Sequence, residues 1–408
     1  MRILLIISAL LTTLVLPAQT VFRFTVETPV SCVGPVAVSC DNILQAGDDA
    51  RQLHLYAVTM DHTEEVAFQY DGSRLWFIPR CGITRYQLVR EGRSRSAEPR
   101  MRIQDTGYSL VLLDGSRPVL SYRYAEMPPP PGVDTLYHRS AFIHPLYTPA
   151  GHVLTRVQPP DHYHHYGVWS AWTATRIGDR EVDFWNLGKG QGRVRYAGLI
   201  SKTEGTLFCS ITVRQEHLFY DDRGQPHTAL EETWTLRAWA GGDTGRIVDL
   251  VMRQHTPLPE GILFESYRYG GGIAFRATEA WTKYNSSLLT SKGTDRNRAD
   301  GTRARWYRAE GGDKEKYGLV MMDHPANHAF PEPLRVWPRN ANRGRGDLFV
   351  NICPVRETPW KLQRGDTITF TYRLWLYDGH CSRQKAEHLW EAFAHPPAIR
   401  KELADDRP

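Results

Sequence analysis

Histidines are concentrated in one short part of the chain. Four of the 16 histidines lie in residues 152–165, and His144 lies just upstream. Large aromatic side chains surround them, among them Trp169 and Trp172. Imidazole titrates near neutral pH and is a common metal ligand, and small-molecule sites combine apolar walls with a few convergent polar groups. We therefore expect an active or binding site in residues 139–172, and we expect its ligand to be a carbohydrate.

The densest part of this segment, DHYHHYGVW, begins at Asp161. If it forms a strand, alternate residues share a face, so that His162 and His164 lie together and His165 faces the other way. An H-x-H pair can hold a divalent metal if a third ligand comes from elsewhere, or it can act as a general acid and hydrogen-bond donor. Alternatively, the two prolines before Asp161 open a loop, and some of the histidines are surface polar groups. We take all three histidines as catalytic candidates with no cofactor, and His162 with His164 as the alternative metal pair.

Two glutamates are candidates for the base or for orienting a sugar hydroxyl. Glu232 alternates with Leu230 and Trp234 on what would be the apolar face of a strand. A buried carboxylate must be paired or protonated, and such groups often mark function, although a structural salt bridge is an equal alternative. Glu265 precedes the glycines at 270–272, which allow a bulge or the close approach of a ligand.

Polar side chains at strand ends and beside aromatic residues are candidates for substrate contact, because loops at strand ends commonly carry function. Asp323 and Asn327 can instead simply form a turn, and Arg268 can instead lie on a solvated strand face. The candidate substrate contacts are His144, Arg156, Trp169, Trp172, Asp183, Asn186, Arg268, Asp323, His324 and Asn327.

Most of the chain alternates apolar and polar residues as β-strands do. Residues 19–100 contain short strands separated by turn residues, which suggests a small immunoglobulin-like sandwich. Residues 101–396 contain more long strands than one ordinary sandwich holds, so we expect a large supersandwich that ends in a short helix. Residues 397–408 form a polar tail, and the fold class that we expect is all-β.

The first 18 residues have the pattern of a secretory signal peptide, because Arg2 is followed by the apolar run Ile3–Leu16. A retained anchor is the alternative reading. No later stretch is long enough to span a membrane, so we expect an exported protein in the periplasm or outside the cell. Export makes disulfides possible, and Cys32 with Cys40 is the most favoured pair, although Cys81 lies in the same region and the sequence does not determine the connectivity.

The composition favours some partners over others. The net charge is +5 and no long basic run is present, so nucleic acid is not a favoured partner. The 12 Trp and 19 Tyr residues suit sugar stacking, although aromatic residues also fill β-sandwich cores. The oligomeric state is not indicated.

Several segments of residues 101–396 are similar to a known family and occur in the same order. They are RSAFIHPLYTPAGHVLTR, PPDHYHHYGVWSAW, VDFWN, GGGIAFR, ARWYRAEG, YGLVMMDHPANHAFPEPLRVW and YRLWLYDG. Together they resemble a bacterial domain family of unknown function whose members automated annotation commonly labels "methane oxygenase PmoA". Members typically show D-H-P-H-H-R-G where this chain reads DHYHHYG, so any role that needs the arginine is in doubt.

The resemblance implies an exported all-β protein from carbohydrate-utilisation gene neighbourhoods, with a fold similar to the galactose-mutarotase-like supersandwich. That fold serves epimerases, polysaccharide lyases and glycoside hydrolases, so it does not select a reaction. The methane oxygenase label is physically implausible, because such a subunit is an integral membrane protein and this chain has no spanning segment after residue 18.

We therefore expect a carbohydrate-active enzyme of the hydrolase, lyase or epimerase type that cleaves or isomerises a glycoside or an oxidised sugar. One histidine of 162–165 would be the general acid, Glu265 or Glu232 the base, and Arg156 and His324 substrate contacts. Two alternatives stay open: a non-catalytic glycan-binding protein, and a metal-dependent enzyme that uses the H-x-H pair.

Overall fold

The structure is a computed structural model that describes residues 19–29, 34–40, 50–92 and 98–402. The chain divides into two compact units, one formed by Met1–Ala97 with Pro397–Pro408 and the other by Glu98–Pro396. Both are built from strands, and the expected all-β fold class is confirmed. The expected signal peptide and Cys32 lie outside the described residues.

The described residues of the small unit form two sheets. The first has, in order, β28 (Ala398–Glu402), β1 (Gln19–Thr28), β7 (Gly82–Arg90), β3 (Leu53–Val58) and β4 (Thr63–Val66). The second has β2 (Val36–Ser39), β6 (Arg74–Phe77) and β5 (Phe68–Tyr70). Alternate apolar residues of these strands point inward and form the core, in which the rings of Phe24, Phe77 and Tyr86 all contact one another. Residues expected to be a polar tail instead supply β28, which pairs antiparallel with β1.

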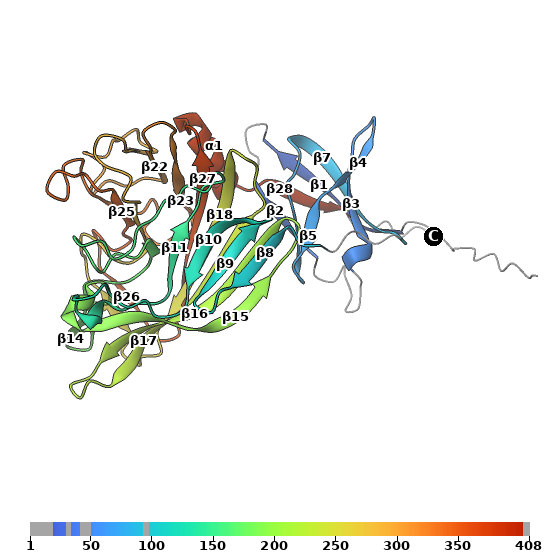
Figure 1. Cartoon of the computed structure of the whole chain (residues 1–408). Coiled ribbons are helices and arrows are strands. Elements are labelled where there is room, and N and C mark those ends of the chain that lie inside the picture. Colours follow the sequence, from blue (N-terminus) through green and yellow to red (C-terminus); the bar gives the residue numbers. More distant parts are fainter. Residues whose placement is uncertain (1–18, 30–33, 41–49, 93–97, 403–408) are drawn as a thin grey trace, which may run out of the picture. The chain divides into compact units, whose positions relative to one another are not determined.

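The large unit contains two eight-stranded sheets. The first has, in order, β24 (Leu334–Val336), β25 (Phe349–Ile352), β20 (Ile273–Arg276), β12 (Val168–Trp169), β11 (Phe142–Leu146), β10 (Arg117–Arg123), β9 (Ser109–Asp114) and β8 (Met101–Asp105). The second has β15 (Gly192–Thr203), β16 (Phe208–Tyr220), β17 (Pro226–Trp239), β18 (Gly245–His255), β27 (Ile368–Asp378), β23 (Tyr317–Asp323), β22 (Trp306–Gly311) and β21 (Ser287–Thr290). The sheets pack face to face, with β8 and β9 against β16 and β17 (Figure 1). This arrangement is the large sandwich that the strand count predicts.

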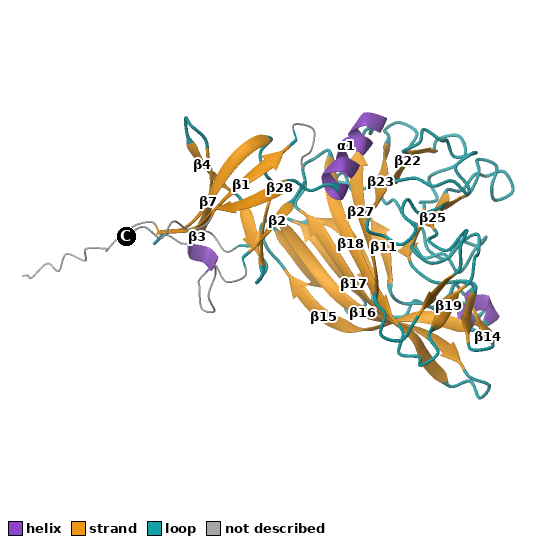
Figure 2. Cartoon of the chain, turned by 180° about the vertical axis from the view of Figure 1, so that it is seen from behind, coloured by secondary structure: helices purple, strands orange, loops and turns teal. Residues whose placement is uncertain are grey.

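Smaller elements complete the large unit. A four-stranded sheet has the order β14 (Arg180–Val182), β13 (Thr175–Ile177), β19 (Ile262–Phe264) and β26 (Trp360–Leu362). Short 3-10 turns lie at Ala50–Gln52, in the small unit, and at Thr135–Tyr137 and Leu187–Lys189. The loops gather at one end of the unit, around β25, β19 and β14 (Figure 2).

The expected C-terminal helix is confirmed as α1, Arg383–Ala394. Ser382 caps its N-terminus by accepting a hydrogen bond from the backbone N–H of Lys385 at 3.1 Å. Leu389, Trp390 and Phe393 lie on its buried face, as their helical spacing predicts. The helix packs against β22 and β23 (Figure 2).

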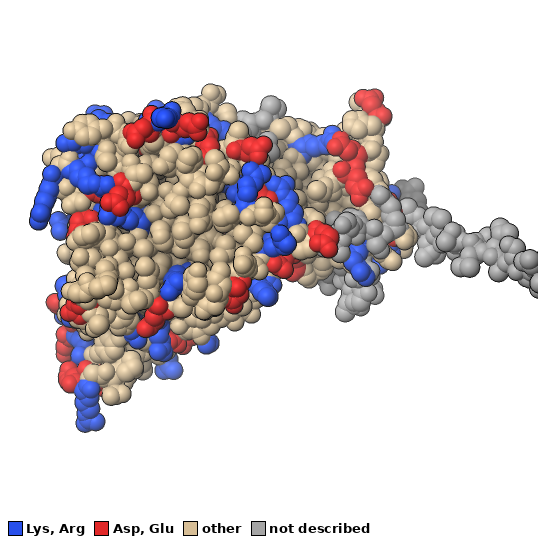
Figure 3. Space-filling view, viewed as in Figure 1, with Lys and Arg blue, Asp and Glu red and all other residues tan. Residues whose placement is uncertain are grey.

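None of the helices in the described part of the chain is long and apolar enough to cross a membrane. Charged side chains of both signs cover the surface of the large unit, and Lys and Arg side chains gather at the end where Figure 1 places β25 (Figure 3).

Three consecutive glycines connect the loop after β19 to strand β20. Gly270, Gly271 and Gly272 all have positive φ angles, of 106°, 67° and 49°, a conformation that glycine adopts far more readily than residues with a Cβ atom. A Cβ atom on Gly271 would lie 2.3 Å from the ring of Trp172. Asn351 of β25 holds the turn by accepting a hydrogen bond from the N–H of Gly270 at 2.7 Å. The glycines therefore let the preceding residues approach the sheet closely.

We predict that Gly271→Ala destabilises the large unit by more than about 2 kcal/mol, because a left-handed alanine costs roughly 1–2 kcal/mol and its methyl group also meets the Trp172 ring. Gly178→Ala is the matched control, since Gly178 has a φ of 56° and nothing within 4 Å of the added Cβ. Urea unfolding of both variants measures the difference. Equal losses of stability would contradict close packing at Gly271.

Candidate functional site

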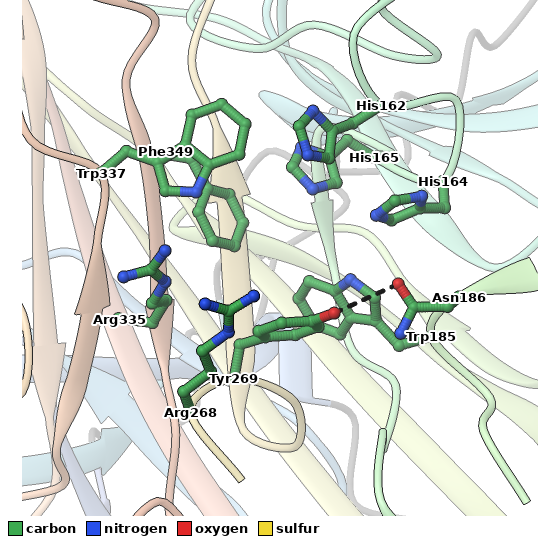
Figure 4. Close-up of a pocket in the computed structure, with 10 residues that line it drawn as sticks. All are labelled: His162, His164, His165, Trp185, Asn186, Arg268, Tyr269, Arg335, Trp337 and Phe349. Carbon is green, nitrogen blue, oxygen red and sulfur yellow. Dashed lines mark hydrogen bonds between the residues drawn. The ribbon is translucent and has the colours of Figure 1, made fainter. Parts of the chain in front are cut away.

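A pocket of about 210 Å³ opens among the loops around β12, β20, β24 and β25. Three histidines lie together, Trp337 and Phe349 pack beside two of them, and the ring of Tyr269 lies below both groups in Figure 4. We call it the histidine pocket. The residues that line it are His162, His164, His165, Trp185, Asn186, Arg268, Tyr269, Arg335, Trp337 and Phe349.

The three histidines come from a tight turn, which agrees with the alternative that the two prolines open a loop, and the expected strand with two faces does not form. The backbone N–H of His162 donates to the carbonyl of Pro159 at 2.9 Å, and that of His165 donates to the carbonyl of His162 at 3.0 Å. Prolines cannot donate to a sheet ladder, so Pro159 and Pro160 favour a turn over a strand here. Because the turn removes the alternation, all three imidazoles reach the same pocket.

A buried arginine holds this turn in place. Arg276, at the end of β20, is 0% exposed. Its Nη2 atom lies 2.9 Å from a carboxylate oxygen of Asp161 and 3.3 Å from one of Asp347. Its guanidinium also stacks on the ring of Trp337, 4.8 Å from the ring centre. Burial lowers the pKa of Arg276, and the two carboxylates oppose that shift, so the guanidinium links the histidine turn to the opposite wall of the pocket.

The hydrogen bonds of two histidines define where their protons lie. Arginine can only donate, so the contact of 3.4 Å between Arg276 Nη1 and His165 Nδ1 makes Nδ1 an acceptor and leaves the proton of neutral His165 on Nε2. Asp161 accepts from Nδ1 of His162 at 2.9 Å, which leaves Nε2 of neutral His162 as an acceptor. The two rings stack with centres 4.8 Å apart. A proton donor and a proton acceptor therefore lie side by side in the pocket.

Burial keeps two of the imidazoles, those of His164 and His165, neutral. It lowers the pKa of His164 to about 4, with a smaller contribution from His162, and it lowers that of His165 well below the usual value. Burial raises the pKa of Asp161, but the hydrogen bond from His162 and the charge of Arg276 outweigh it and hold that pKa at about 2. The pocket thus combines neutral imidazoles with an ionised carboxylate behind them.

Aromatic rings form the walls of the pocket. Phe349 stacks on His165 with ring centres 4.7 Å apart, and Trp337 lies 4.7 Å from His162. Trp185 contacts Tyr269 with ring centres 5.4 Å apart. None of these four aromatic residues was a sequence candidate, and neither was Arg335. Tyr269 has a sequence signal in the glycines that follow it, whereas Trp337, Phe349 and Arg335 converge only through sheet pairing.

The two candidate glutamates lie outside the histidine pocket. Glu232 is 0% exposed in the sandwich core, as the alternation of β17 predicts, and it accepts a hydrogen bond from Nε2 of Gln254 at 2.7 Å. Burial raises its pKa to about 7. A carboxyl group sealed between two sheets cannot contact a substrate in this pocket, so the expectation of a Glu232 base needs correction.

Glu265 lies in a second pocket of about 200 Å³, which also contains Asp183 and Tyr267. Its carboxylate pairs with Nε of Arg176 at 3.0 Å. Asp183 receives a hydrogen bond from Nδ2 of Asn186 at 2.7 Å, so the two pockets meet at the side chain of Asn186. We call this second cavity the acidic pocket, and Glu265 and Asp183 belong to it.

The other candidates from residues 139–172 do not line the histidine pocket, and most of them pack or pair with residues around it. His144 accepts or donates in a 2.9 Å hydrogen bond with Oγ1 of Thr155, and burial lowers its pKa to about 4. Arg156 pairs with Asp347 at 3.6 Å. Trp169 is fully buried and packs on His165, with ring centres 5.1 Å apart, whereas Trp172 is buried further away and donates to Gln254.

The candidates Asp323, His324 and Asn327 form a structural turn instead of a binding loop. Asp323 accepts hydrogen bonds from Nδ2 of Asn327 and the N–H of Glu332, both at 2.8 Å, and burial raises its pKa to about 6. His324 packs on Phe393 of α1. None of the three lines the histidine pocket, because their polar atoms bind the turn itself.

No cluster of three or more His, Cys, Asp or Glu side chains suited to a metal ion is found in the described ranges of the chain. The thiols of Cys209, Cys353 and Cys381 are free and buried.

We predict that Arg276→Met destabilises the protein by about 3 kcal/mol or more, because removing one partner of a buried ion pair leaves the charge of Asp161 without its guanidinium partner. Arg156→Met is the matched control, and we expect a loss below about 1 kcal/mol, as for partly exposed pairs. Urea unfolding measures both. Equal losses of stability in the two variants would contradict the claim that Arg276 holds the histidine turn in place.

We predict that lowering the pH reduces the stability of the wild-type protein more than that of the variant His144→Gln. The unfolded imidazole titrates near 6.5 and the folded one at about 4, so stability is intact above pH 6.5 and lost as the pH falls towards 4. Between pH 7.5 and 5 we expect the wild type to lose about 2 kcal/mol relative to the variant. The buried carboxyl groups of Glu232 and Asp323 titrate in both proteins, so their contributions to the stability difference cancel. Parallel urea unfolding curves across this range would contradict a neutral, buried His144.

Comparison with known proteins gives the family and a similarity of fold. The model of a family of unknown function, DUF6807, matches residues 109–391. This stretch falls within the region for which a resemblance to a family of unknown function was noted, and the match gives no support to the methane oxygenase label. No match was found among curated proteins.

Two solved structures are similar at low identity. A GalM/aldose epimerase homologue from C. elegans is 8% identical with a TM-score of 0.29, and the match covers 70% of this chain and 100% of that one. An alpha-mannosidase from Enterococcus faecalis is 9% identical with a TM-score of 0.39, covering 95% of this chain and 47% of that one. At these TM-scores neither protein supports an argument about activity. The family match covers most of the chain, and the chain therefore belongs to the family of unknown function DUF6807.

Proposed function

We propose that this chain is an exported carbohydrate-active enzyme whose histidine pocket receives one sugar ring. The walls of the pocket support this assignment, because the partly exposed rings of Trp337 and Tyr269 offer apolar surface to the C–H groups of a sugar. Arg268, Arg335 and Asn186 offer hydrogen bonds to its oxygens, and a few placed polar groups on apolar walls are typical of small-molecule sites. The apolar run Ile3–Leu16 is the support for export.

The single observation that supports an enzymatic role is that two adjacent neutral imidazoles would carry their proton on different ring nitrogens. His162 presents an acceptor at Nε2 because Asp161 holds its other nitrogen, and His165 presents a donor at Nε2 because Arg276 holds its other nitrogen. One side chain can therefore take a proton from a sugar while its neighbour gives one, which is the requirement for cleaving or isomerising a sugar by acid–base catalysis. The proposed base is His162 in place of a glutamate.

A second candidate function is glycan binding without catalysis. It is favoured by one observation: none of the described residues that line the histidine pocket is a carboxylate, and glycoside hydrolysis usually requires a pair of them. In this case the aromatic walls alone would be needed, and the histidines would serve only as hydrogen-bond partners.

We predict that His162→Asn and His165→Asn each lower turnover at least about 100-fold, because general acid–base groups typically contribute 10²–10⁴-fold. The probes are neutral and acidic oligosaccharides in D2O, followed by proton NMR. This readout distinguishes hydrolysis by new reducing ends, elimination by vinyl protons, and epimerisation by exchange of a ring proton. His255→Asn, on β18 and away from the pocket, should keep full activity.

The binding function makes a different prediction for the same samples. Trp337→Ala would abolish sugar binding measured by calorimetry, both histidine variants would bind normally, and no probe would react with the wild type. Reaction at the wild-type rate in both histidine variants, with their melting temperatures unchanged, would rule out the proposed acid–base pair.

A further inference from the structure

The histidine pocket is rich in hydrogen-bond donors and poor in acceptors. Two guanidinium groups, those of Arg268 and Arg335, face it from the side away from the histidines (Figure 4). Among its acceptors, Oδ1 of Asn186 already receives the hydroxyl of Tyr269 at 3.3 Å. The hydroxyls of a neutral sugar donate as well as accept, so such a sugar would leave many of these donors without a partner.

Arg268 is the more available of the two cations. Its side chain is exposed, and it makes no ion pair or side-chain hydrogen bond with any residue of the described ranges. Its backbone is nevertheless fixed, because its carbonyl accepts a hydrogen bond from Nη1 of Arg356 at 2.9 Å. The guanidinium lies 5.7 Å from the centre of the Tyr269 ring. A positioned cation without a partner at the wall of a pocket is a binding group for an anion.

Arg335 is only partly neutralised. Its Nη1 atom donates to Asp300 at 2.8 Å, but the same carboxylate also receives two hydrogen bonds of 3.2 Å from Arg356. One negative charge is therefore shared between two guanidinium groups, and positive charge remains beside Arg268. The bridge formed by Arg356 also holds the backbone of Arg268 and the side chain of Arg335 in one arrangement.

Other cations near the pocket are already paired. Asp347 is contacted by Arg156, Arg276 and Arg345, and Glu279 and Asp161 also pair with Arg156 and Arg276. The positive excess at the pocket therefore rests on Arg268 and Arg335. Figure 3 shows Lys and Arg side chains gathered at the end of the large unit where β25 lies. The nearby imidazoles contribute no negative charge. A pocket of this kind attracts anions from solution.

We infer, on the basis of the proposed function, that the sugar bound here is acidic and places its carboxylate against Arg268 and Arg335. A planar carboxylate matches the fork of one free guanidinium in a bidentate way, and Arg335 then contributes its remaining N–H groups. The ring of the same sugar then lies in the histidine pocket beside Tyr269. Uronic acids have this chemistry, since they are pyranoses in which a carboxylate replaces the terminal hydroxymethyl group.

The test compares sugars that differ only in this group. Calorimetric titration of the purified protein with glucuronate and glucose, and with galacturonate and galactose, should show at least ten-fold tighter binding of one uronate than of its neutral partner. Added salt should weaken the uronate complex, because screening acts on the ion pair. Arg268→Gln should lose at least ten-fold in affinity for the uronate and much less in affinity for the neutral sugar, because glutamine keeps a hydrogen-bond donor but not the charge.

Arg253→Gln is the matched control, because Arg253 is also an exposed arginine but lies on β18 away from the pocket. Equal binding of uronates and neutral sugars, still lost in Trp337→Ala, would overturn the acidic-sugar inference and leave the proposed sugar pocket standing. Tighter binding of glucose 6-sulfate than of glucuronate would overturn the choice of a carboxylate. Failure of the wild type to bind any of these sugars would overturn both proposals.

Discussion

The candidate site depends on one buried cation. Arg276 lies at the end of β20, with its guanidinium between Asp161 and Asp347 and against the ring of Trp337. Without it, the carboxylate behind His162 would lack its counter-charge, and the turn that carries the histidines would lose its link to the sheet. Burying a charge is expensive unless it is paired and hydrogen-bonded, so this arrangement stabilises one geometry of the turn strongly over others.

The same cation determines the proton states on which the proposed chemistry rests. A guanidinium beside Nδ1 of His165 and a carboxylate beside Nδ1 of His162 give the two imidazoles opposite roles. Burial then keeps His164 and His165 neutral at pH 7. A partner that fixes the tautomer and orientation of an imidazole is a general feature of sites that use histidine. Two histidines can therefore divide the work that many sugar-processing enzymes assign to two carboxylates.

The two candidate glutamates show what the alternation of apolar and polar residues along a strand can predict and what it cannot. Alternation in β17 predicts that Glu232 is buried, and it is. It does not say whether the buried face meets a pocket or the opposite sheet, because that depends on which strands pack above it. In this fold β17 faces the closed core, whereas Glu265 follows a strand of the small four-stranded sheet and enters the acidic pocket beside Arg176. Both residues are thus separated from the histidines by tertiary structure alone.

By itself, the sequence determined the all-β class, the long strands of the large unit, the C-terminal helix and the segment that carries the histidines, because all of these rest on local periodicity or on residue clustering. It also indicated aromatic and cationic partners in general terms. The two prolines before Asp161 also allowed a turn for the histidine segment, but only the tertiary structure decided that Arg276 supports this turn and that Trp337, Phe349 and Arg335 complete the pocket. These residues come from strands and loops far apart in the chain, and sheet pairing, which local sequence does not encode, brings them together.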